Sequence, residues 1–261
     1  MSDRQDRQVH STAVVSPDVT LGAFVVIEAG ARIGAGCVIG HGVVIRRDTV
    51  IGAQVRIDDH AVLGKEPMRA ANTAVTKLGE LPPLTIGDGA ILGSGATVYR
   101  GATLGKRVLV ADGAAVRERV AIGERTIIGR GVTIENDCTI GRFVKIETGA
   151  YITAYSVLEN RVFIAPMVAT SNDRFIGRTE ERFKHFKGVT VQRGGRVGVG
   201  AVLLPGITIG PDGVVAAGAV VTHDVPARKI AMGCPARIVR EVAEAELLDR
   251  QIWDDVRLGE S

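Results

Sequence analysis

The 261-residue sequence is poor in large aromatic side chains, in cysteine and in histidine. It holds six Phe, three Tyr, one Trp, three Cys and five His. So few Cys indicate neither a disulfide framework nor a CxxC metal site, and no two His stand at the spacing of a zinc site. No apolar run is long enough to span a membrane and no signal peptide is evident, so we expect a cytoplasmic protein. A net charge of +3 is too mild to indicate nucleic-acid binding.

Branched aliphatic residues, by contrast, recur at every sixth position over most of the chain. The longest uninterrupted run begins at Ile86 and ends at Ile164, and smaller residues such as Ala90 and Cys138 stand two positions before its members. A period of six fits neither the 3.6-residue turn of a helix nor the alternation of a hairpin strand. It is typical of a parallel β-helix of hexapeptide repeats, in which each hexad supplies one short strand and one turn.

Three hexads should close one triangular coil, so residues eighteen positions apart should stack roughly 4.8 Å apart. Counting the shorter runs on either side, the repeat predicts an all-β solenoid of about ten coils. The period fails over residues 65–84 and 171–188, where we expect two loops to leave the coil. Residues 1–238 are thus predicted to form one β-helix domain. Apolar residues at helical spacing predict a capping C-terminal helix and tail over residues 239–261.

The eighteen-residue stacking gathers polar side chains at one corner, where the second loop departs. Asn136 and Asp137 would lie below Ala154 and Tyr155, and Asn172 and Asp173 above them. Asn and Asp are also common turn residues, which explains the first pair without any function. Asn172 and Asp173 begin a long loop beside this polar column, which favours a functional role.

The second loop is rich in basic residues and contains His185. Such a His is either a solvated surface residue or a general base, and the Arg and Lys side chains are either solvated or contacts to phosphate. The residues alone do not decide between these alternatives.

Several motifs beyond the repeat resemble those of the left-handed β-helix acyltransferases. They are the break at Thr170-Ser171-Asn172-Asp173-Arg174, the return at Lys187-Gly188, the run Leu203-Leu204-Pro205-Gly206, and the ending that runs from Gly218 through Pro226 to Gly233-Cys234-Pro235-Ala236-Arg237. Within that family the chain is most similar to N-acetyltransferases that modify nucleotide-linked amino sugars, such as the dTDP-3-amino-3,6-dideoxyhexose enzymes.

The resemblance implies a left-handed coil, a homotrimer, and acetyl-CoA as co-substrate in a groove between subunits, without a metal. It places Ala216, Ala217 and Gly218 beside the pantetheine, and Cys234 and Arg237 near the adenine and phosphates. Together with the stacking, it makes Asn172, Asp173 and His185 the candidate catalytic residues. The candidates for binding the nucleotide sugar are Glu135, Asn136, Tyr155 and Arg174.

The predicted activity is transfer of an acetyl group from acetyl-CoA to the amino group of a dTDP- or UDP-linked 3-amino-deoxyhexose. The first alternative is an O-acyltransferase or a longer-chain N-acyltransferase of the same fold. A γ-type carbonic anhydrase shares the solenoid but requires three zinc-binding His, and a non-catalytic solenoid would need neither the loops nor the coenzyme-type ending. The sequence leaves open the sugar, the base, the acylated position and whether a side chain acts as base.

Overall fold

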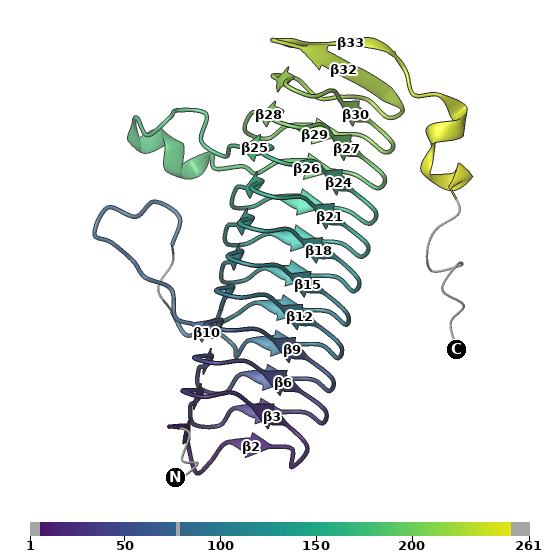
Figure 1. The fold of residues 1–261 in the computed structure, drawn as a ribbon. Coiled ribbons are helices and arrows are strands. Elements are labelled where there is room, and N and C mark those ends of the chain that lie inside the picture. The colour runs from purple at the N-terminus through teal and green to yellow at the C-terminus, as the bar shows by residue number, and fades with distance from the viewer. Residues whose placement is uncertain (1–5, 77–78, 252–261) are drawn as a thin grey trace.

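A computed structural model describes residues 6–76 and 79–251, which form a long parallel β-helix (Figure 1). Successive strands belong in turn to three sheets, here called A, B and C, with 11, 10 and 12 strands. Sheet A contains β1 (Gln8–Val9), β4 (Val26–Ile27), β7 (Val44–Ile45), β10 (Val62–Lys65), β13 (Thr97–Tyr99), β16 (Ala115–Val116), β19 (Thr133–Ile134), β22 (Tyr151–Ile152), β25 (Ala169–Thr170), β28 (Val202–Leu203) and β31 (Val220–Val221).

The other two sheets have the same short strands. Sheet B contains β2 (Val14–Val15), β5 (Arg32–Ile33), β8 (Val50–Ile51), β11 (Thr85–Ile86), β14 (Thr103–Leu104), β17 (Ala121–Ile122), β20 (Thr139–Ile140), β23 (Val157–Leu158), β26 (Thr190–Val191) and β29 (Thr208–Ile209). Sheet C contains β3 (Thr20–Leu21), β6 (Val38–Ile39), β9 (Arg56–Ile57), β12 (Ile91–Leu92), β15 (Leu109–Val110), β18 (Ile127–Ile128), β21 (Lys145–Ile146), β24 (Phe163–Ile164), β27 (Arg196–Val197), β30 (Val214–Val215), β32 (Lys229–Gly233) and β33 (Ala236–Glu241).

The predicted register is confirmed. Ile134 lies opposite Ile152 in the parallel pair of β19 and β22, eighteen residues apart, and both side chains are fully buried. The second residue of each two-residue strand points inward, where branched aliphatic side chains stack along the axis. The solenoid is slightly longer than the predicted ten coils, because β1 begins it earlier and β32 and β33 extend it at the far end.

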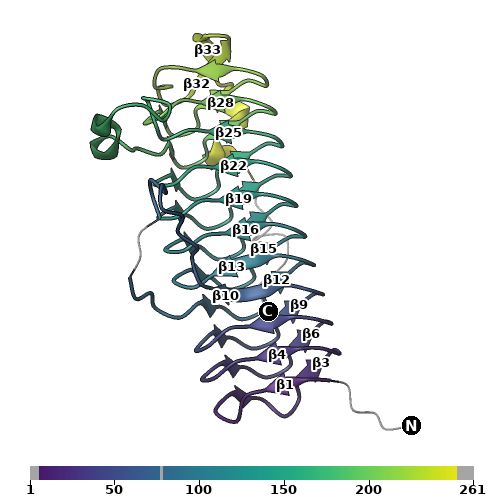
Figure 2. The same cartoon turned by 90° about the vertical axis from the view of Figure 1, so that its left-hand side faces the viewer.

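The turns form three corners that run the length of the solenoid, named here A–B, B–C and C–A after the sheets that they join. Both extruded loops leave the A–B corner, the first after β10 and the second after β25. They project from the same side of the solenoid, opposite the C-terminal segment (Figure 1), and Figure 2 looks onto this side. The second loop contains the 3-10 helix η1 (Glu180–Lys184).

The predicted C-terminal helix is not present in the described residues. Ala236–Glu241 instead forms β33, which pairs antiparallel with β32. Two 3-10 turns follow, η2 (Glu244–Glu246) and η3 (Leu248–Arg250). The apolar residues whose spacing predicted a helix are buried in this irregular segment instead, as Val242, Leu247 and Leu248 show. The rest of the predicted helix, residues 252–261, lies outside the described residues. No helix in the described part of the chain is long and apolar enough to cross a membrane.

Candidate active site

The second loop begins where Thr170 replaces the usual aliphatic inward residue. The Thr170 hydroxyl accepts a hydrogen bond from the Thr153 nitrogen at 2.8 Å and donates one to the Tyr151 carbonyl at 3.1 Å. The side chain therefore takes the place of a main-chain acceptor, and the chain leaves the ladder here. The loop closes where the Lys187 nitrogen donates to the Asn172 carbonyl at 3.1 Å.

The predicted stacking holds only as far as the start of this loop. Ser171 still donates to the Leu203 carbonyl of the next coil. Above Tyr155, however, the structure places Gly188 and not Asp173, so that part of the prediction is wrong. A Cβ at Gly188 would lie 2.4 Å from the Ser156 nitrogen and from the Tyr155 carbonyl carbon, so only glycine fits here. The loop therefore carries Asp173 out of the column before the coil resumes.

Asp173 organises the start of the loop. Its two carboxylate oxygens accept hydrogen bonds from the main-chain nitrogens of Phe175 and Gly177, each at 2.9 Å, and Arg182 lies 3.5 Å away. Desolvation alone would raise the pKa of Asp173, but the two N–H donors and Arg182 outweigh it and lower the pKa. The carboxylate is thus ionised and already engaged, which suits holding the loop better than accepting a substrate proton.

His185 lies at the end of the same loop beside a carboxylate. Its Nε2 is 3.0 Å from Glu181 Oε1, and its ring centroid lies 5.9 Å from that of Phe175. Hydrogen bonds to His185 and Lys184 lower the pKa of Glu181, so this carboxylate is ionised at neutral pH and can orient the imidazole. The Nδ1 atom makes no hydrogen bond with another residue in the described ranges.

A cavity of about 330 Å³ opens beside His185 at the A–B corner. The loop supplies a mostly basic wall, and the next coil supplies Pro205 and Gly206. Two of the predicted site residues, His185 and Arg174, are brought together here with Lys184 and Lys187. Neither Asn172 nor Asp173 lines this cavity. The main-chain carbonyl of Asn172 nevertheless accepts a hydrogen bond from the nitrogen of Lys187, which does line it.

Glu135, Asn136 and Tyr155 belong to a separate polar cluster lower on the A–B corner. Asn136 is fully buried, its Nδ2 donates to Asp137 at 2.6 Å, and its Oδ1 has no hydrogen-bond partner among the described residues. Tyr155 is half-buried, and burial followed by the charge of Asp137 raises its pKa. None of these three residues lines the basic cavity.

Three further residues of this cluster, Arg117, Glu118 and Arg119, were not predicted from the sequence. Glu118 is fully buried and accepts hydrogen bonds from Arg117 at 2.9 and 3.2 Å. Arg117 also donates to Glu135 at 3.2 Å, and Arg119 pairs with Asp137 at 2.6 Å. The signal was available, because Arg117-Glu118-Arg119 stands eighteen residues before Glu135-Asn136-Asp137 and opposite charges therefore stack.

Arg117 links this cluster to the first loop. Its guanidinium donates to the Thr76 hydroxyl at 3.1 Å and lies 5.1 Å from the centre of the Tyr99 ring. The buried Arg100 donates to the Leu81 carbonyl at 2.9 Å, which fixes the returning end of the loop. The first loop is thus tied to the corner between the two departure points.

The residues that the resemblance assigns to the coenzyme lie at the C-terminal end of the solenoid. Ala216, Ala217 and Gly218 form a turn of the C–A corner directly after β30. Cys234 and Arg237 lie in the hairpin of β32 and β33, and β32 pairs with β30. A Cβ at Gly218 would meet nothing within 4 Å, so this turn is open to a ligand. The residues that the resemblance assigns to the coenzyme are therefore near one another but on a different corner from His185.

Within the described residues, no group of three or more His, Cys, Asp and Glu side chains could hold a metal ion. Cys37 and Cys138 are buried in the core, and Cys234 is exposed.

The repeat, corners and loops define a hexapeptide-repeat β-helix, and comparison with known proteins agrees. Residues 12–47 match the family described as bacterial transferase hexapeptide (six repeats). Residues 83–117 and 189–223 match the hexapeptide repeat of succinyl-transferase. These matches show hexapeptide repeats in three segments of the chain, and they confirm its resemblance to the hexapeptide-repeat acyltransferases.

Two curated relatives are 2,3,4,5-tetrahydropyridine-2,6-dicarboxylate N-acetyltransferases. That of Clostridium perfringens is 46% identical over 61 residues, which are 23% of this chain and 26% of the relative. That of Staphylococcus aureus is 39% identical over 56 residues, 22% of this chain and 23% of the relative. The chain thus spans about a quarter of the length of these relatives. A Francisella novicida UDP-N-acetylglucosamine acyltransferase structure matches 96% of this chain and 74% of its own, with 20% identity and a TM-score of 0.52, which shows a shared fold.

Proposed function

We propose that this protein transfers an acetyl group from acetyl-CoA to the amino group of a nucleotide-linked amino sugar. The observation that carries the proposal is the basic cavity of the second loop, in which His185 is held by Glu181 beside Arg174 and Lys187. The curated relatives named N-acetyltransferases support acetyl transfer to nitrogen.

The charge of the cavity suits the phosphates of a nucleotide-linked acceptor. Arg174 and Lys187 form no ion pair with another residue in the described ranges, so both charges are available to a ligand. A guanidinium and an ammonium group are common partners of phosphate oxygens. We assign the diphosphate to these two residues and the amino sugar to the part of the cavity nearest His185.

The reaction needs a neutral amine, a proton acceptor and a leaving thiolate. The amine nitrogen bonds to the thioester carbonyl carbon, the carbon–sulfur bond breaks, and the thiolate of coenzyme A departs. In our proposal the amine proton passes to Nδ1 of His185, whose ring is oriented by Glu181, and then to the thiolate. Asn172 adjoins the cavity through its main-chain contact with Lys187 without lining it, and we propose that its side-chain amide reaches the amine of the bound substrate. Asp173 acts as a positioning residue that fixes the loop.

A second copy of the chain would complete the site. His185 lies in the loop that leaves the A–B corner and Ala216 lies at the C–A corner, so the two residues are on opposite edges of sheet A. One chain therefore does not join the two halves. The first residue of every described strand of sheet A is uncharged, and Lys65 at the end of β10 is the one charged residue of these strands, in contrast to Lys145 and Arg196 within sheet C. Parallel sheets are usually covered on both faces, so a homotrimer in which sheet A faces a neighbour fits both observations.

A second candidate acceptor is a small amine-bearing dicarboxylate. The curated relatives are named for a dicarboxylate, and a cavity with several cations would also hold two carboxylates. Both candidates use the same loop and the same chemistry.

The test is a steady-state assay with acetyl-CoA, in which amide product is detected by mass spectrometry. The acceptors are dTDP- and UDP-linked 3-amino sugars, the free amino sugars, and amino dicarboxylates. We expect turnover with a nucleotide-linked amino sugar and at least ten-fold lower kcat/KM for the free sugar. Turnover of dicarboxylates alone would select the second candidate, and turnover of hydroxyl acceptors alone would contradict N-acetylation. Sedimentation of the same preparation should show a trimer; a fully active monomer would contradict the shared site.

A further inference from the structure

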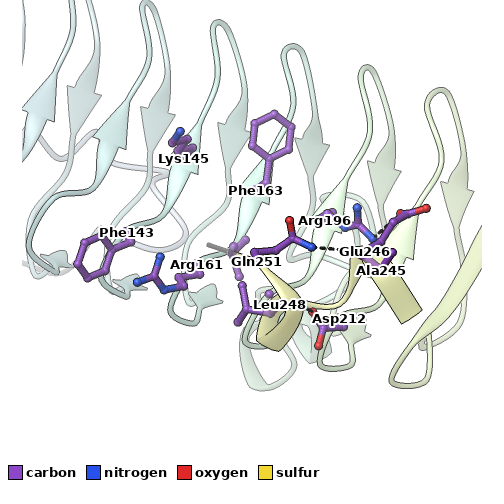
Figure 3. Close-up of a pocket in the computed structure, with 12 residues that line it drawn as sticks. Phe143, Lys145, Arg161, Phe163, Arg196, Asp212, Ala245, Glu246, Leu248 and Gln251 are labelled. Atoms are coloured by element: carbon purple, nitrogen blue, oxygen red, sulfur yellow. Dashed lines mark hydrogen bonds and ion pairs between the residues drawn. The ribbon is translucent and has the colours of Figure 1, made fainter. Parts of the chain in front are cut away.

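A second cavity lies on another part of the molecule and has a different composition. Its volume is about 340 Å³, and it is formed between the outer face of sheet C, the B–C corner and the C-terminal segment (Figure 3). Neither extruded loop contributes to it, since both leave the A–B corner. This volume is within the range of small-molecule sites.

One wall of this cavity is a row of outward side chains on three adjacent strands. Lys145, Phe163 and Arg196 lie opposite one another in the parallel pairs of β21, β24 and β27. Their Cα atoms are thus roughly 4.8 Å apart from strand to strand. The Phe163 ring projects from its strand between the two cations and is 37% exposed (Figure 3). An exposed aromatic ring between two cations offers a stacking surface beside positive charge.

The B–C corner repeats this arrangement next to the cavity. Arg125, Phe143 and Arg161 occupy equivalent turn positions eighteen residues apart, all with positive φ. The guanidinium carbons of Arg161 and Arg125 lie 4.4 and 5.7 Å from the centre of the Phe143 ring. These cation–π contacts hold the Arg161 side chain at the mouth of the cavity, next to Phe143 (Figure 3).

The charges that line the cavity leave positive charge for a ligand. Glu246 is paired with Arg196 at 3.0 Å, and Asp212 accepts a hydrogen bond from the Leu248 nitrogen at 3.0 Å. The ammonium group of Lys145 forms no ion pair or hydrogen bond with another residue in the described ranges. Leu248 is buried and forms an apolar floor. The cavity therefore has an apolar floor, a stacking ring and one unpaired cation.

We infer that this cavity binds a nucleoside monophosphate, with the base against Phe163 and the phosphate at Lys145 and Arg161. A flat heterocycle stacks on an aromatic ring whatever its base identity, and a phosphate matches an ammonium beside a guanidinium. The inference does not depend on the proposed acetyl transfer, because the two cavities share no lining residue.

The experiment is calorimetric titration of the full-length protein with adenosine 5′-monophosphate, with adenosine and inorganic phosphate as the two partial ligands. Lys145→Ala should weaken binding about ten-fold, as expected for loss of one charge-assisted contact. Phe163→Leu should weaken binding of the nucleotide about ten-fold but leave inorganic phosphate unaffected, because stacking involves the base alone. Arg56→Ala is the matched control, since Arg56 is an outward cation of the same sheet on the distant strand β9.

The nucleotide could instead bind in the basic cavity of the second loop. The variants Arg174→Ala and Lys187→Ala distinguish that site from the cavity at sheet C. If these two variants lose nucleotide binding while Lys145→Ala and Phe163→Leu keep it, the inference is wrong. It is also overturned if the wild-type protein shows no saturable binding of the nucleotide at millimolar concentration. Loss of acetyl transfer in the Arg174 variant with nucleotide binding retained would support two independent sites.

Discussion

The main-chain nitrogen of Lys187 donates a hydrogen bond to the carbonyl oxygen of Asn172 at 3.1 Å, which ties the two ends of the second loop together. Fifteen positions of sequence separate the two residues, yet the coil resumes directly after Lys187. The loop is therefore an insertion between β25 and β26, and both strands still pair with the next coil. Its conformation depends on its own contacts, chiefly those of Asp173 and Glu181.

Asp173→Asn should loosen the loop without destabilising the solenoid. The variant keeps the size of the side chain but weakens the charge-assisted bonds from Phe175 and Gly177. Hydrogen exchange over residues 171–188, measured by mass spectrometry, should become about ten-fold faster while the melting temperature stays unchanged. If exchange is unaffected but activity is lost, the carboxylate acts on the substrate and not on the loop.

The pH dependence of this contact follows from the lowered pKa of Asp173. A folded-state pKa below that of the unfolded chain means that the stabilisation is fully present above about pH 4 and is lost as the pH falls through the folded value. Between about pH 8 and pH 5 the wild-type loop should therefore show constant protection, once intrinsic exchange rates are corrected. A loss of protection near neutral pH would contradict the role of Asp173 as an ionised anchor.

The fold was predictable because its sequence signal is periodic. An inward Ile or Val every six residues determines strand, sheet and register together, as the pairing of Ile134 with Ile152 shows. The departure points of both loops were predictable for the same reason, since the period fails there. The contacts inside the loops were not, because Asp173, His185 and Glu181 meet through an irregular backbone that no period describes.

Two other errors have physical causes in neighbouring structure. Residues 239–241 were predicted to begin a helix, but the edge of β32 offers unpaired main-chain groups, and β33 satisfies them. Arg117 and Glu118 were not among the predicted site residues, although stacking at eighteen residues brings opposite charges together. Local patterns alone do not reveal either outcome.

Asn172→Ala should reduce kcat/KM about ten-fold, since the amide is assigned to orienting the amine in the transition state. The loop closure involves the main-chain carbonyl of Asn172, which the variant retains, so melting should not change. Asn72→Ala in the first loop is the matched control, because Asn72 is exposed. Wild-type kinetics in both variants would remove Asn172 from the mechanism.

Glu118→Gln should destabilise the protein by about 2 kcal/mol, because it neutralises the fully buried partner of Arg117 and leaves Glu135 as the remaining carboxylate paired with that guanidinium. Urea unfolding monitored by circular dichroism measures the change. Glu147→Gln, at a turn of the C–A corner, should have no comparable effect. Equal unfolding midpoints for the two variants would show that the cluster does not stabilise the corner.

Thiol reactivity should separate the three cysteines. Burial raises the pKa of Cys37, and it raises the pKa of Cys138 to about 12, so neither forms a thiolate at neutral pH. An aromatic disulfide reagent should therefore titrate one thiol per folded chain, that of the exposed Cys234, and three after denaturation. Cys234→Ser should abolish the reaction of the folded protein. Fast reaction of a second thiol would contradict the buried positions of Cys37 and Cys138.

The central claim is that acetyl transfer takes place at His185 in the basic cavity of the second loop, and its most direct test is the kcat/KM of His185→Ala. With acetyl-CoA and the best nucleotide-linked amino sugar, we expect a loss of about a hundred-fold, the usual contribution of a general base. Melting should be unchanged because His185 lies outside the coil, and His60→Ala, an exposed His at another corner, should have wild-type activity. Wild-type kcat/KM for His185→Ala, with amide product formed, would contradict the account.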